Sequence, residues 1–400
     1  MKEGVRMFIL MLILISCGEV EEVGFDLPET KGLTVDNIET GLPIINIKAN
    51  IAEINNMMDL PHNKTYVKSS LDYFSNDLTI RQKPITIRIK GAGSVDLPLK
   101  SLEIIFDTKE NLGSELFKNL NPSDIHYLSS LKSFRIRNSG QDFNKTMIKD
   151  KAYSQLAIDL KLNFIPMFVG SPTQVFINEE YYGLLNIRSE SNLNGISEIL
   201  NADMNELVIY KVDAKNGNIE YNEGNYALTD DLEEAIDRGN SDELQNMIDI
   251  NSFIDYVIYE DYIGNTDWPH NNIRMYSHKG EPFKFIFYDS DHAARKTKNP
   301  LLPELEYVSH DLGKIYRAFR KIEGFDKLLA DRQELIYDKL AVSSFEKIVD
   351  DMANEIESDM LYQISKYKSI ASPYEWNWNL GKLKRDFEMR DKYIRDKYDL

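Results

Sequence analysis

The spacing of hydrophobic residues changes its period along this 400-residue chain, and the change limits the folds that the chain can adopt. Isoleucines occupy every second position within residues 84–90, which is the period of a β-strand. From residue 230 onward, hydrophobic residues instead recur as on amphipathic helices, with charged residues between them. The chain therefore predicts an α+β fold with a β-rich part at residues 36–195 and a mainly helical part at residues 196–400.

The same patterns predict individual elements. Strands are expected over residues 42–54, 84–90, 100–106, 133–138, 174–177, 184–187 and 207–211. Helices are expected over residues 146–160, 241–248, 252–263, 312–330, 333–340, 344–366 and 375–398. Residues 55–77 are polar and irregular, so no element is expected there. Trp376 and Trp378, at the start of the last helix, are expected to pack in the core rather than to bind a ligand.

The composition is that of an acidic globular protein. Its 47 basic and 65 acidic side chains give a net charge of 47 − 65 = −18, and 42% of the residues are hydrophobic. Proteins that bind nucleic acid need a basic face, so no nucleic-acid partner is expected. The single cysteine, Cys17, excludes a disulfide within the chain.

The N-terminal segment is organised as a secretion signal. Two basic residues come first, residues 7–15 are almost wholly apolar, and the segment ends in Leu-Ile-Ser-Cys at Cys17. This ending resembles the lipobox of bacterial lipoproteins, whose cysteine is acylated. We therefore expect residues 1–17 to be a lipoprotein signal peptide and residues 18–35 a flexible acidic tether. A lipid on Cys17 would anchor the protein to a bacterial membrane outside the cytoplasm, at the outer membrane or cell surface. A plain secretory signal or an N-terminal anchor is the alternative.

A β-hairpin is predicted between residues 273–278 and residues 283–288, joined by a turn at residues 279–282. If the last residue of the first strand pairs with the first residue of the second, Asn272 lies opposite Asp289. The open end of the hairpin then brings an amide oxygen and a carboxylate together.

Further acidic side chains lie near this open end. Asp291 follows Asp289 by two positions, and Asp267 lies just upstream of Asn272 in a loop. Such oxygen ligands suit Mg²⁺, which binds a few carboxylates together with substrate phosphates. Phosphoryl transfer needs a metal holder of this kind and an Asp that accepts the proton of the attacking hydroxyl. Each residue alone would more often serve a turn or cap.

Two nearby histidines support a different chemistry. His270 and His292 flank the same acidic residues, and mixtures of Asp, His and Asn also build the centres of metal-dependent hydrolases. That hypothesis requires both imidazoles to face the metal. The predicted strand alternation leaves His292 beyond the end of the hairpin.

A glycine turn and a lysine form a second candidate site. Gly91, Gly93 and Ser94 interrupt the strand pattern, and Lys100 falls by parity on the apolar face of residues 100–106. A lysine on a buried face needs a partner, and backbone N–H groups of a glycine turn can bind phosphate. The alternative is a hairpin turn followed by an edge lysine that reaches water.

The order of these pieces is similar to that in protein kinases, where the catalytic Asp precedes a metal-binding Asn by five positions, as Asp267 precedes Asn272. The chain resembles the CotH family of atypical kinases, named for a spore coat protein, over residues 42–398. The resemblance rests on KGAGSVDLPLKSLEI, SFRIRNSGQDF, FINEEYYGLLNIR, GNTDWPHNN, FYDSD and EWNWNLGKLKRDFEMR. It implies a two-lobed, kinase-like fold and an enzyme that uses ATP and Mg²⁺ to phosphorylate Ser or Thr of secreted or surface proteins.

The resemblance also implies roles for residues. Lys100 matches the lysine that contacts ATP, and Gly91, Gly93 and Ser94 match the turn beside the phosphates. Asp267 matches the catalytic Asp. Asn272, Asp289 and Asp291 match the metal ligands.

Three positions depart from the family pattern. Lys90 stands where an Arg is usual, and Glu179 replaces the Gly of an Asn-Gly turn. Ser189 occupies the place of a Glu, and Glu190 follows one position late. A surface lipoprotein that keeps the fold only to bind a partner is therefore the second hypothesis, and the sequence does not separate phosphate transfer from nucleotide transfer.

Overall fold

The computed structural model describes residues 27–118, 128–228, 232–294 and 301–399. The predicted signal peptide with Cys17 lies outside the described residues, as does the first part of the predicted tether. The rest of that tether, residues 27–35, contains turns, and Leu27 packs partly buried against the core. No helix in these described ranges is long and apolar enough to span a membrane.

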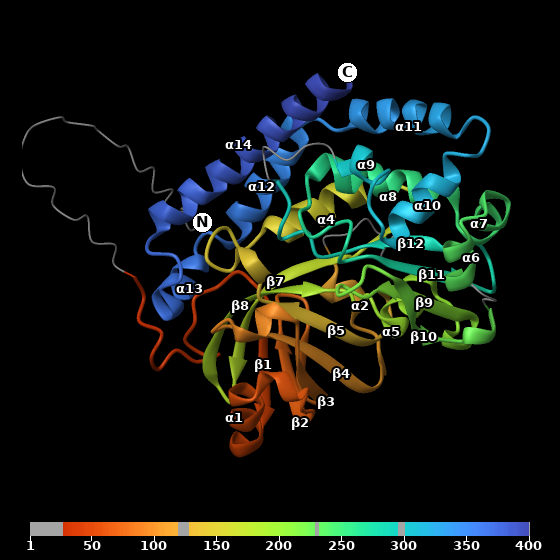
Figure 1. Cartoon of the computed structure of the whole chain (residues 1–400). Coiled ribbons are helices and arrows are strands. Elements are labelled where there is room, and N and C mark those ends of the chain that lie inside the picture. Colours follow the sequence, from red (N-terminus) through yellow and green to blue (C-terminus); the bar gives the residue numbers. More distant parts are fainter. Residues whose placement is uncertain (1–26, 119–127, 229–231, 295–300, 400) are drawn as a thin grey trace, which may run out of the picture.

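Seven strands close into a barrel in the order β1-β2-β3-β4-β5-β8-β7 (Figure 1). The strands are β1 Ile44–Ala49, β2 Val67–Phe74, β3 Thr79–Lys90, β4 Ser101–Glu110, β5 Leu131–Arg137, β7 Val169–Ile177 and β8 Glu180–Arg188. Neighbours are antiparallel except β1 and β7, which pair in parallel. Ile87, Ile104 and Phe134 face one another across three strands and are at most 1% exposed. The predicted isoleucine alternation therefore marks the barrel core.

The opposite faces of the same strands carry charged residues. Cross-strand pairing aligns Arg88 of β3, Glu103 of β4, Arg135 of β5 and Arg188 of β8, which we call the charged row. Arg88 forms an ion pair with Glu103. Arg135 Nη2 lies 2.9 Å from the carboxylate of Glu190, just after β8. Because buried charges require partners, these pairs allow the row to lie under other elements.

A second sheet of five strands has the order β10-β9-β11-β12-β6. Its strands are β6 Ile165–Pro166, β9 Leu207–Val212, β10 Ile219–Gly224, β11 Arg274–His278 and β12 Lys284–Phe287. Arg274 Nη1 donates to the Ser191 carbonyl at 2.6 Å, which joins this sheet to the segment after β8. Because β11 pairs with β9 and β12 pairs with β6, the predicted hairpin lies inside this sheet and is not an isolated pair of strands.

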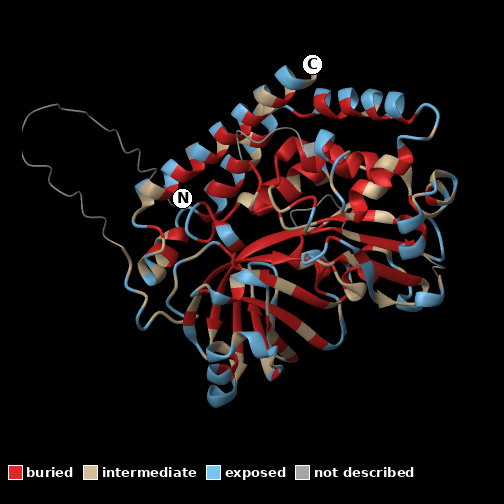
Figure 2. Ribbon diagram, viewed as in Figure 1, coloured by how far each residue is buried: buried red, intermediate tan, exposed pale blue. Residues whose placement is uncertain are grey.

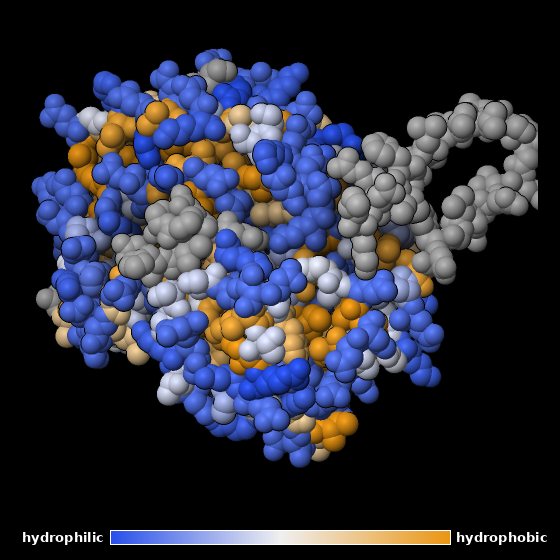
Figure 3. Space-filling model, turned by 180° about the vertical axis from the view of Figure 1, so that it is seen from behind, coloured by the Kyte–Doolittle hydropathy of each residue, from blue (hydrophilic) through white to orange (hydrophobic). Residues whose placement is uncertain are grey.

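The helices lie mostly above the barrel and the second sheet in the view of Figure 1, except that α1 lies at the opposite end of the barrel. They are α1 Ile51–Asp59, α2 Gly113–Leu116, α4 Lys149–Leu160, α5 Leu193–Leu200, α6 Leu232–Arg238, α7 Ser241–Met247, α8 Ile250–Ile263, α9 Leu301–Glu304, α10 Asp311–Phe319, α11 Phe325–Lys339, α12 Val342–Ile356, α13 Met360–Tyr367 and α14 Pro373–Tyr398. Short 3-10 turns occur at Gly93–Asp96 and Gly140–Asp142. α8 is buried along most of its length, whereas α11 and α14 expose one face to solvent (Figure 2). Hydrophilic residues predominate on the opposite side of the molecule (Figure 3), as the composition leads one to expect.

The α+β class predicted from the sequence is confirmed. Elements from the two predicted parts pack on each other, because α4 contacts α12 and α13 contacts β8. The division at residue 195 into two lobes therefore stays a prediction.

Several predicted elements were wrong in extent. The strand expected over residues 42–54 stops at Ala49, because Asn50 caps α1 by accepting the N–H groups of Ala52 and Glu53. The strands β2 and β10 were not predicted. The helix expected over residues 344–366 is two helices, α12 and α13. The side chain of Asp359, between them, accepts hydrogen bonds from the distant Thr40 and Gln174.

Candidate functional site

β11 and β12 form the predicted hairpin, but the predicted register between them was wrong by one residue. Arg274 pairs with Ile286. This register does not place Asn272 directly opposite Asp289, as the sequence argument had it.

The turn of the hairpin explains this shift. Lys279 and Gly280 have φ of +56° and +75°, and the Glu281 N–H donates to the His278 carbonyl at 3.0 Å. Left-handed residues at both central positions of a turn match the twist of the flanking strands. Continuing the register from Tyr276 and Lys284 leaves three residues between the paired strands, one fewer than the four that the sequence suggested.

Asn272 nevertheless reaches both expected neighbours. Its Nδ2 atom lies 3.4 Å from Asp267 Oδ2 and 3.3 Å from the Asp289 carbonyl, and it donates to both. Asn272 and Asp289 have φ of +59° and +63°. Asn and Asp tolerate this left-handed region better than other residues, and such conformations concentrate at functional sites. The resulting bends bring the open end of the hairpin to Asp267.

The end of α8 positions Asp267. The helix stops at Gly264, which has a φ of +60°. Arg390 of α14 donates to the Tyr262 carbonyl at 3.1 Å, so a positive charge lies at the C-terminus of α8, where the helix dipole favours it. Asn265 Oδ1 then accepts the Asp267 N–H at 3.2 Å. The catalytic candidate is thus held by a capped helix end rather than by a free loop.

Arg137 of β5 joins the carboxylates of the hairpin. Its Nη2 atom contacts Asp289 Oδ1 and lies 3.2 Å from Asp291 Oδ2, while its Nε atom lies 3.3 Å from Asp150 Oδ2. Only 13% of the Arg137 side chain is exposed. Opposite charges interact strongly when they are withdrawn from water. We call Asp267, Asp289 and Asp291 the acidic cluster, and Arg137 is the cation that holds its last two members together.

Further contacts fix Asp150, the third partner of Arg137. Arg188 Nη2 lies 2.6 Å from Asp150 Oδ2. Ser290, between the two cluster aspartates, donates its N–H to Asp150 Oδ1 at 2.8 Å. This buried network ties β5, β8, α4 and the end of β12 to one point.

A turn after β5 completes the surroundings of Asp291. The Gln141 N–H donates to Asp291 Oδ2 at 2.9 Å. Gly140 has a φ of +57°, and a Cβ there would lie 1.9 Å from Asp291 Oδ2 and 2.9 Å from Arg137 Nη2. Glycine at this position is therefore required for the close approach of the two charged groups.

Burial and charge repulsion act on the cluster. Burial and the neighbouring carboxylate of Asp289 together raise the pKa of Asp291 to about 7, although Arg137 acts to lower it. Behind the cluster, burial raises the pKa of Glu260 in α8 to about 8. A bound cation would relieve the repulsion within the cluster.

One of the two histidines lies at the cluster. His292 lies beyond the end of β12, as predicted, and its Nδ1 is 3.9 Å from Asp267 Oδ1 while its Nε2 is 3.9 Å from Asp291 Oδ1. His270 instead lies beside His310, with ring centroids 6.4 Å apart. The two-histidine hydrolase centre considered above is therefore not assembled.

The donor atoms fit a hard cation such as Mg²⁺. In the described parts of the chain, Asp289 Oδ2 and Asp291 Oδ1 accept no hydrogen bond, so both remain available as ligands. A protein cage is not formed, since no three His, Cys, Asp or Glu side chains of the described residues surround one point. Mg²⁺ does not need such a cage, because it takes one or two carboxylates plus water and substrate phosphates.

Sequence comparison adds the family to this geometry. The pattern of the CotH kinase protein family matches residues 87–394, which is most of the chain and includes the whole acidic cluster. The chain belongs to the CotH kinase family. A search of curated proteins found no match. The matched part runs from within β3 to within α14, so it covers both the charged row and the hairpin.

In this CotH kinase family member, the glycine turn lies next to the acidic cluster. Asn138 Nδ2 lies 3.4 Å from the Ser94 carbonyl, and Asn138 Oδ1 accepts the Gly140 N–H at 3.1 Å. A Cβ on Gly93 would lie 4.0 Å from the side chain of Gln141. The turn at residues 91–94 is thus one side chain away from the groups that contact Asp291.

Lys100 donates hydrogen bonds to the segment that directly follows this turn. Its Nζ atom donates to the carbonyls of Val95 and Leu97 at 2.7 and 3.1 Å. The ammonium group of Lys100 therefore stabilises the backbone beside the turn and does not contact the carboxylates of the acidic cluster.

The departures from the family pattern find partners. Lys90 Nζ lies 3.4 Å from Glu103 and 3.7 Å from Glu190. Glu190, one position late in the sequence, is fully buried and paired with Arg135. The late glutamate therefore still supplies a carboxylate to the cations of the barrel face.

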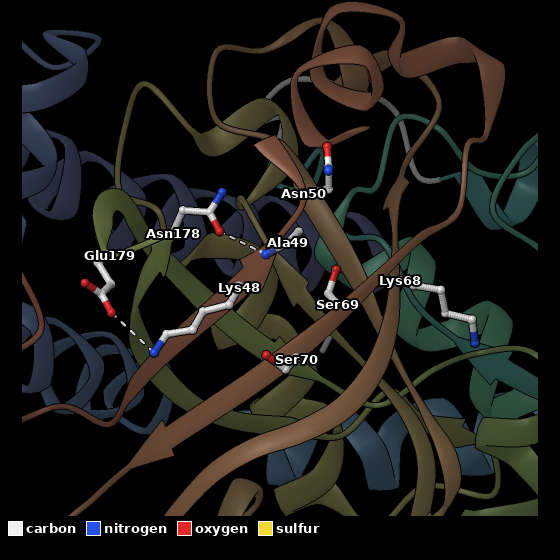
Figure 4. Close-up of a pocket in the computed structure, with 8 residues that line it drawn as sticks. All are labelled: Lys48, Ala49, Asn50, Lys68, Ser69, Ser70, Asn178 and Glu179. Atoms are coloured by element: carbon white, nitrogen blue, oxygen red, sulfur yellow. Dashed lines mark hydrogen bonds and ion pairs between the residues drawn. The ribbon is translucent and has the colours of Figure 1, made fainter. Parts of the chain in front are cut away.

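A hollow on the surface lies away from the acidic cluster (Figure 4). It is bordered by β1, β2 and the turn between β7 and β8. Lys48 pairs there with Asp72 at 3.0 Å and with Glu179 at 3.3 Å. Glu179 has a φ of +69°, where the family pattern has glycine. None of the predicted site residues lines this hollow, so it has no part in the site.

The sequence argument missed the basic half of the site. Arg137, Asp150, Arg188 and Gly140 were not singled out, although they hold the cluster together. The available signal was Arg135 and Arg137 at alternate positions of a strand whose other face is apolar. Two arginines on one face of a buried strand require carboxylate partners.

Gly140→Ala is expected to displace Asp291 and to lower the free energy of unfolding by about 1–3 kcal/mol. Gly239→Ala is the matched control, because Gly239 has a similar φ of +58° and open space where the Cβ would lie. Thermal unfolding of both variants measures the difference. Equal losses in the two variants would show that backbone strain alone, and not the contact with Asp291, makes glycine necessary.

Glu260→Gln is expected to make the stability less dependent on pH. The pKa of Glu260 is about 8 in the folded protein, above its ordinary value. The parent protein therefore keeps its full stability below about pH 4.5 and loses up to about 5 kcal/mol as the pH rises through 8. Urea unfolding of both proteins from pH 5 to 9 measures this loss. Parallel curves for parent and variant would contradict it, and Glu388→Gln on the exposed face of α14 is the control.

Proposed function

We propose that this CotH kinase family member transfers the γ-phosphoryl group of ATP to Ser or Thr hydroxyls of secreted or surface proteins. The observation that carries the proposal is the convergence of Asp267, Asn272, Asp289 and Asp291 at one end of a hairpin. Kinase chemistry needs little covalent participation from the protein. It needs positioned charges and one proton acceptor.

Asp267 is the proposed proton acceptor. Its side chain is 31% exposed, so an acceptor hydroxyl can reach it, while Asn272 and Asn265 hold it in place. Among the described residues, Arg137 forms ion pairs with Asp289 and Asp291 and none with Asp267, whose nearest ionisable partner is His292 at 3.9 Å. Its carboxylate is therefore available to orient the hydroxyl and to take its proton.

Asn272, Asp289 and Asp291 would hold Mg²⁺. The ion would neutralise charge on the transferring phosphoryl group. The role of Arg137 is then to keep the two aspartates at a fixed separation before and after the nucleotide binds. Their mutual repulsion favours uptake of a cation.

The nucleotide phosphates would lie between the glycine turn and Arg137. The backbone N–H groups of Gly91, Gly93 and Ser94 would contact them, with Lys100 holding the shape of the turn. Two positions before Arg137 on β5 lies Arg135 of the charged row, which with Glu190 and Lys90 would border the rest of the nucleotide.

The site of action follows from the N-terminal signal. A lipid on Cys17 would place the enzyme outside the cytoplasm, where its substrates would be secreted or surface proteins. Labelling of the full chain with radioactive palmitate in cells tests this step, with Cys17→Ser as the unlabelled control.

The proposal is tested with the full chain purified in detergent. Mg²⁺-dependent ATP binding by calorimetry, with transfer of label from γ-labelled ATP to the protein itself, is the expected result. Label transfer from α-labelled ATP would instead establish nucleotide transfer. Absence of any ATP binding would favour the hypothesis of a surface protein that keeps the fold only to bind a partner.

A further inference from the structure

Four polar side chains lie buried against the loop that carries Asp267. Tyr256 and Glu260 come from α8, and Asn265 and Trp268 come from the loop that follows the helix. None of the four is more than 1% exposed. We call them the Glu260 network.

The Glu260 network contacts both ends of the loop at residues 265–272. Asn265 Oδ1 accepts the N–H of Asp267 at 3.2 Å. The Tyr256 hydroxyl donates to the Asn272 carbonyl at 3.3 Å, and its ring stacks on Phe285 of β12 with centroids 4.7 Å apart. The proposed proton acceptor and one proposed metal ligand are therefore both held by side chains of this network.

Four polar atoms of the network make no direct hydrogen bond to the described residues. They are Glu260 Oε1, Glu260 Oε2, Asn265 Nδ2 and Trp268 Nε1. The side chains of Asn265 and Tyr256 nevertheless lie next to the Glu260 carboxyl, and the Trp268 indole lies next to the Tyr256 hydroxyl. Because buried polar groups are almost always hydrogen-bonded, these neighbours are the partners of the four atoms, directly or through a bridging water.

The surroundings of the Glu260 carboxyl disfavour its charged form. Its ionisable neighbours are Tyr256, Tyr259, Asp267 and Asp289. The cations packed against α8 pair with other carboxylates, namely Arg332 of α11 with Asp255, Arg390 of α14 with Asp261, and Lys284 of β12 with Asp249. The acidic group of α9, Glu304, is exposed. Burial, with smaller contributions from the two aspartates, raises the pKa of Glu260 to about 8, so the carboxyl is neutral at pH 7.

The hydroxyl of Tyr256 has a single hydrogen and two possible acceptors. A neutral Glu260 can donate its own hydrogen to the Tyr256 oxygen, which leaves the Tyr256 hydrogen for the Asn272 carbonyl. An ionised Glu260 only accepts, and a carboxylate is a stronger acceptor than a carbonyl, so it would draw that hydrogen away from Asn272. The link between α8 and Asn272 therefore depends on the proton of Glu260.

We propose that Glu260, in its neutral form, is a positioning residue that holds Asp267 through Asn265 and Asn272 through Tyr256. The inference rests on the proposed kinase function and deepens it, because it makes the reactive geometry of the same site depend on a buried proton. Loss of that proton releases the Asn272 carbonyl and adds a negative charge behind Asp267. Glu260 itself is fully buried and touches no substrate.

The first test observes the Glu260 network without the reaction. The indole N–H signals of the full chain, labelled with nitrogen-15, are followed by NMR from pH 6 to 9.5, and Trp268→Phe identifies the signal of Trp268. We expect this signal to shift with a midpoint near pH 8 in the parent protein and not to shift in Glu260→Gln. Equal shifts in the two proteins would overturn the proposal.

The other two of the three tryptophans are internal controls, because both lie in α14, outside the Glu260 network. Trp376 is buried as predicted and donates from Nε1 to the Thr146 carbonyl at 3.0 Å. Trp378 is 53% exposed, which corrects the expectation that it packs in the core. A change in all three signals at the same pH would report a general loss of structure and would contradict the assignment to Glu260.

The second test measures the consequence for transfer. Glutamine stays neutral at every pH and can donate and accept as the neutral carboxyl does. We expect the ratio of the single-turnover transfer rate of Glu260→Gln to that of the parent to rise up to about tenfold from pH 7 to pH 9, where about nine-tenths of Glu260 is ionised. Glu388→Gln, on the exposed face of α14, is the control and should show a constant ratio.

A further variant separates hydrogen bonding from packing. Glu260→Met keeps much of the side-chain volume and removes the hydrogen bonds, so transfer at pH 7 should be about tenfold slower than in Glu260→Gln. Thermal unfolding of both variants shows whether each is folded at the assay temperature. A ratio that does not change with pH, or equal transfer by the methionine and glutamine variants, would overturn the proposal.

Failure of the positioning role and failure of the kinase function give different results. Label transfer by a protein whose Trp268 signal does not respond to Glu260 would contradict the positioning role alone. A Trp268 signal that follows Glu260 in a protein that does not bind ATP would contradict the kinase function, and with it the part of Glu260 in transfer.

Discussion

Replacing Arg137 with methionine is expected to lower the free energy of unfolding by about 3–5 kcal/mol, because it leaves buried carboxylates without their shared cation. Arg137 contacts Asp150, Asp289 and Asp291 at once. Methionine keeps much of the side-chain volume, so the loss reports charge rather than a cavity. Urea unfolding at pH 8 is the measurement.

The loss should depend on pH. The pKa of Asp291 is already raised to about 7 and would rise further without Arg137. A carboxyl group with a raised pKa destabilises the folded protein only above its unfolded pKa, as the pH approaches and passes the folded value. The variant is therefore expected to recover much of its stability at pH 5.

Two controls sharpen this experiment. Arg385→Met, at an exposed position of α14, should change stability by less than about 0.5 kcal/mol. Added Mg²⁺ should raise the melting temperature of the Arg137 variant more than that of the parent, because the ion replaces the missing charge between Asp289 and Asp291. A loss that is independent of both pH and Mg²⁺ would show that Arg137 acts by packing alone.

Replacing Asp267 with asparagine is expected to slow label transfer from ATP by about 10²–10⁴-fold while leaving Mg²⁺-ATP affinity nearly unchanged, because a proton acceptor is lost and the metal ligands are kept. Asparagine preserves the size of the side chain and its contact with Asn272. Single-turnover transfer with γ-labelled ATP, beside calorimetric ATP binding, separates the two effects. Asp396→Asn, exposed near the end of α14, is the control.

The result would count against the assignment in either of two ways. Transfer at the parental rate would remove Asp267 from the chemistry. Loss of ATP binding together with transfer would place Asp267 among the metal ligands instead.

Much of the fold was predictable because its signal is local. Alternating isoleucines predicted β3. The helical spacing of hydrophobic residues predicted α8, and Gly264 marked its C-terminal end. Errors arose where a distant contact decided the outcome. Asp359 interrupts a continuous helical pattern because it binds Thr40 and Gln174, which lie far away in the sequence. No periodicity within residues 344–366 carries that information.

The site divides in the same way. Asp267, Asn272, Asp289 and Asp291 were predicted together because one hairpin brings them together over a short stretch of chain. An error of one residue in the register did not separate them, since the bends at Asn272 and Asp289 decide where the side chains lie.

The sequence by itself determined the α+β class, the family and the acidic half of the site, because these depend on period, motif and short-range turns. Only the tertiary structure decided which cation meets the carboxylates. Arg137 and Asp289 are 152 positions apart, and they meet because the barrel packs against the second sheet. Such pairings depend on long-range burial of charge, for which a local sequence pattern carries no signal.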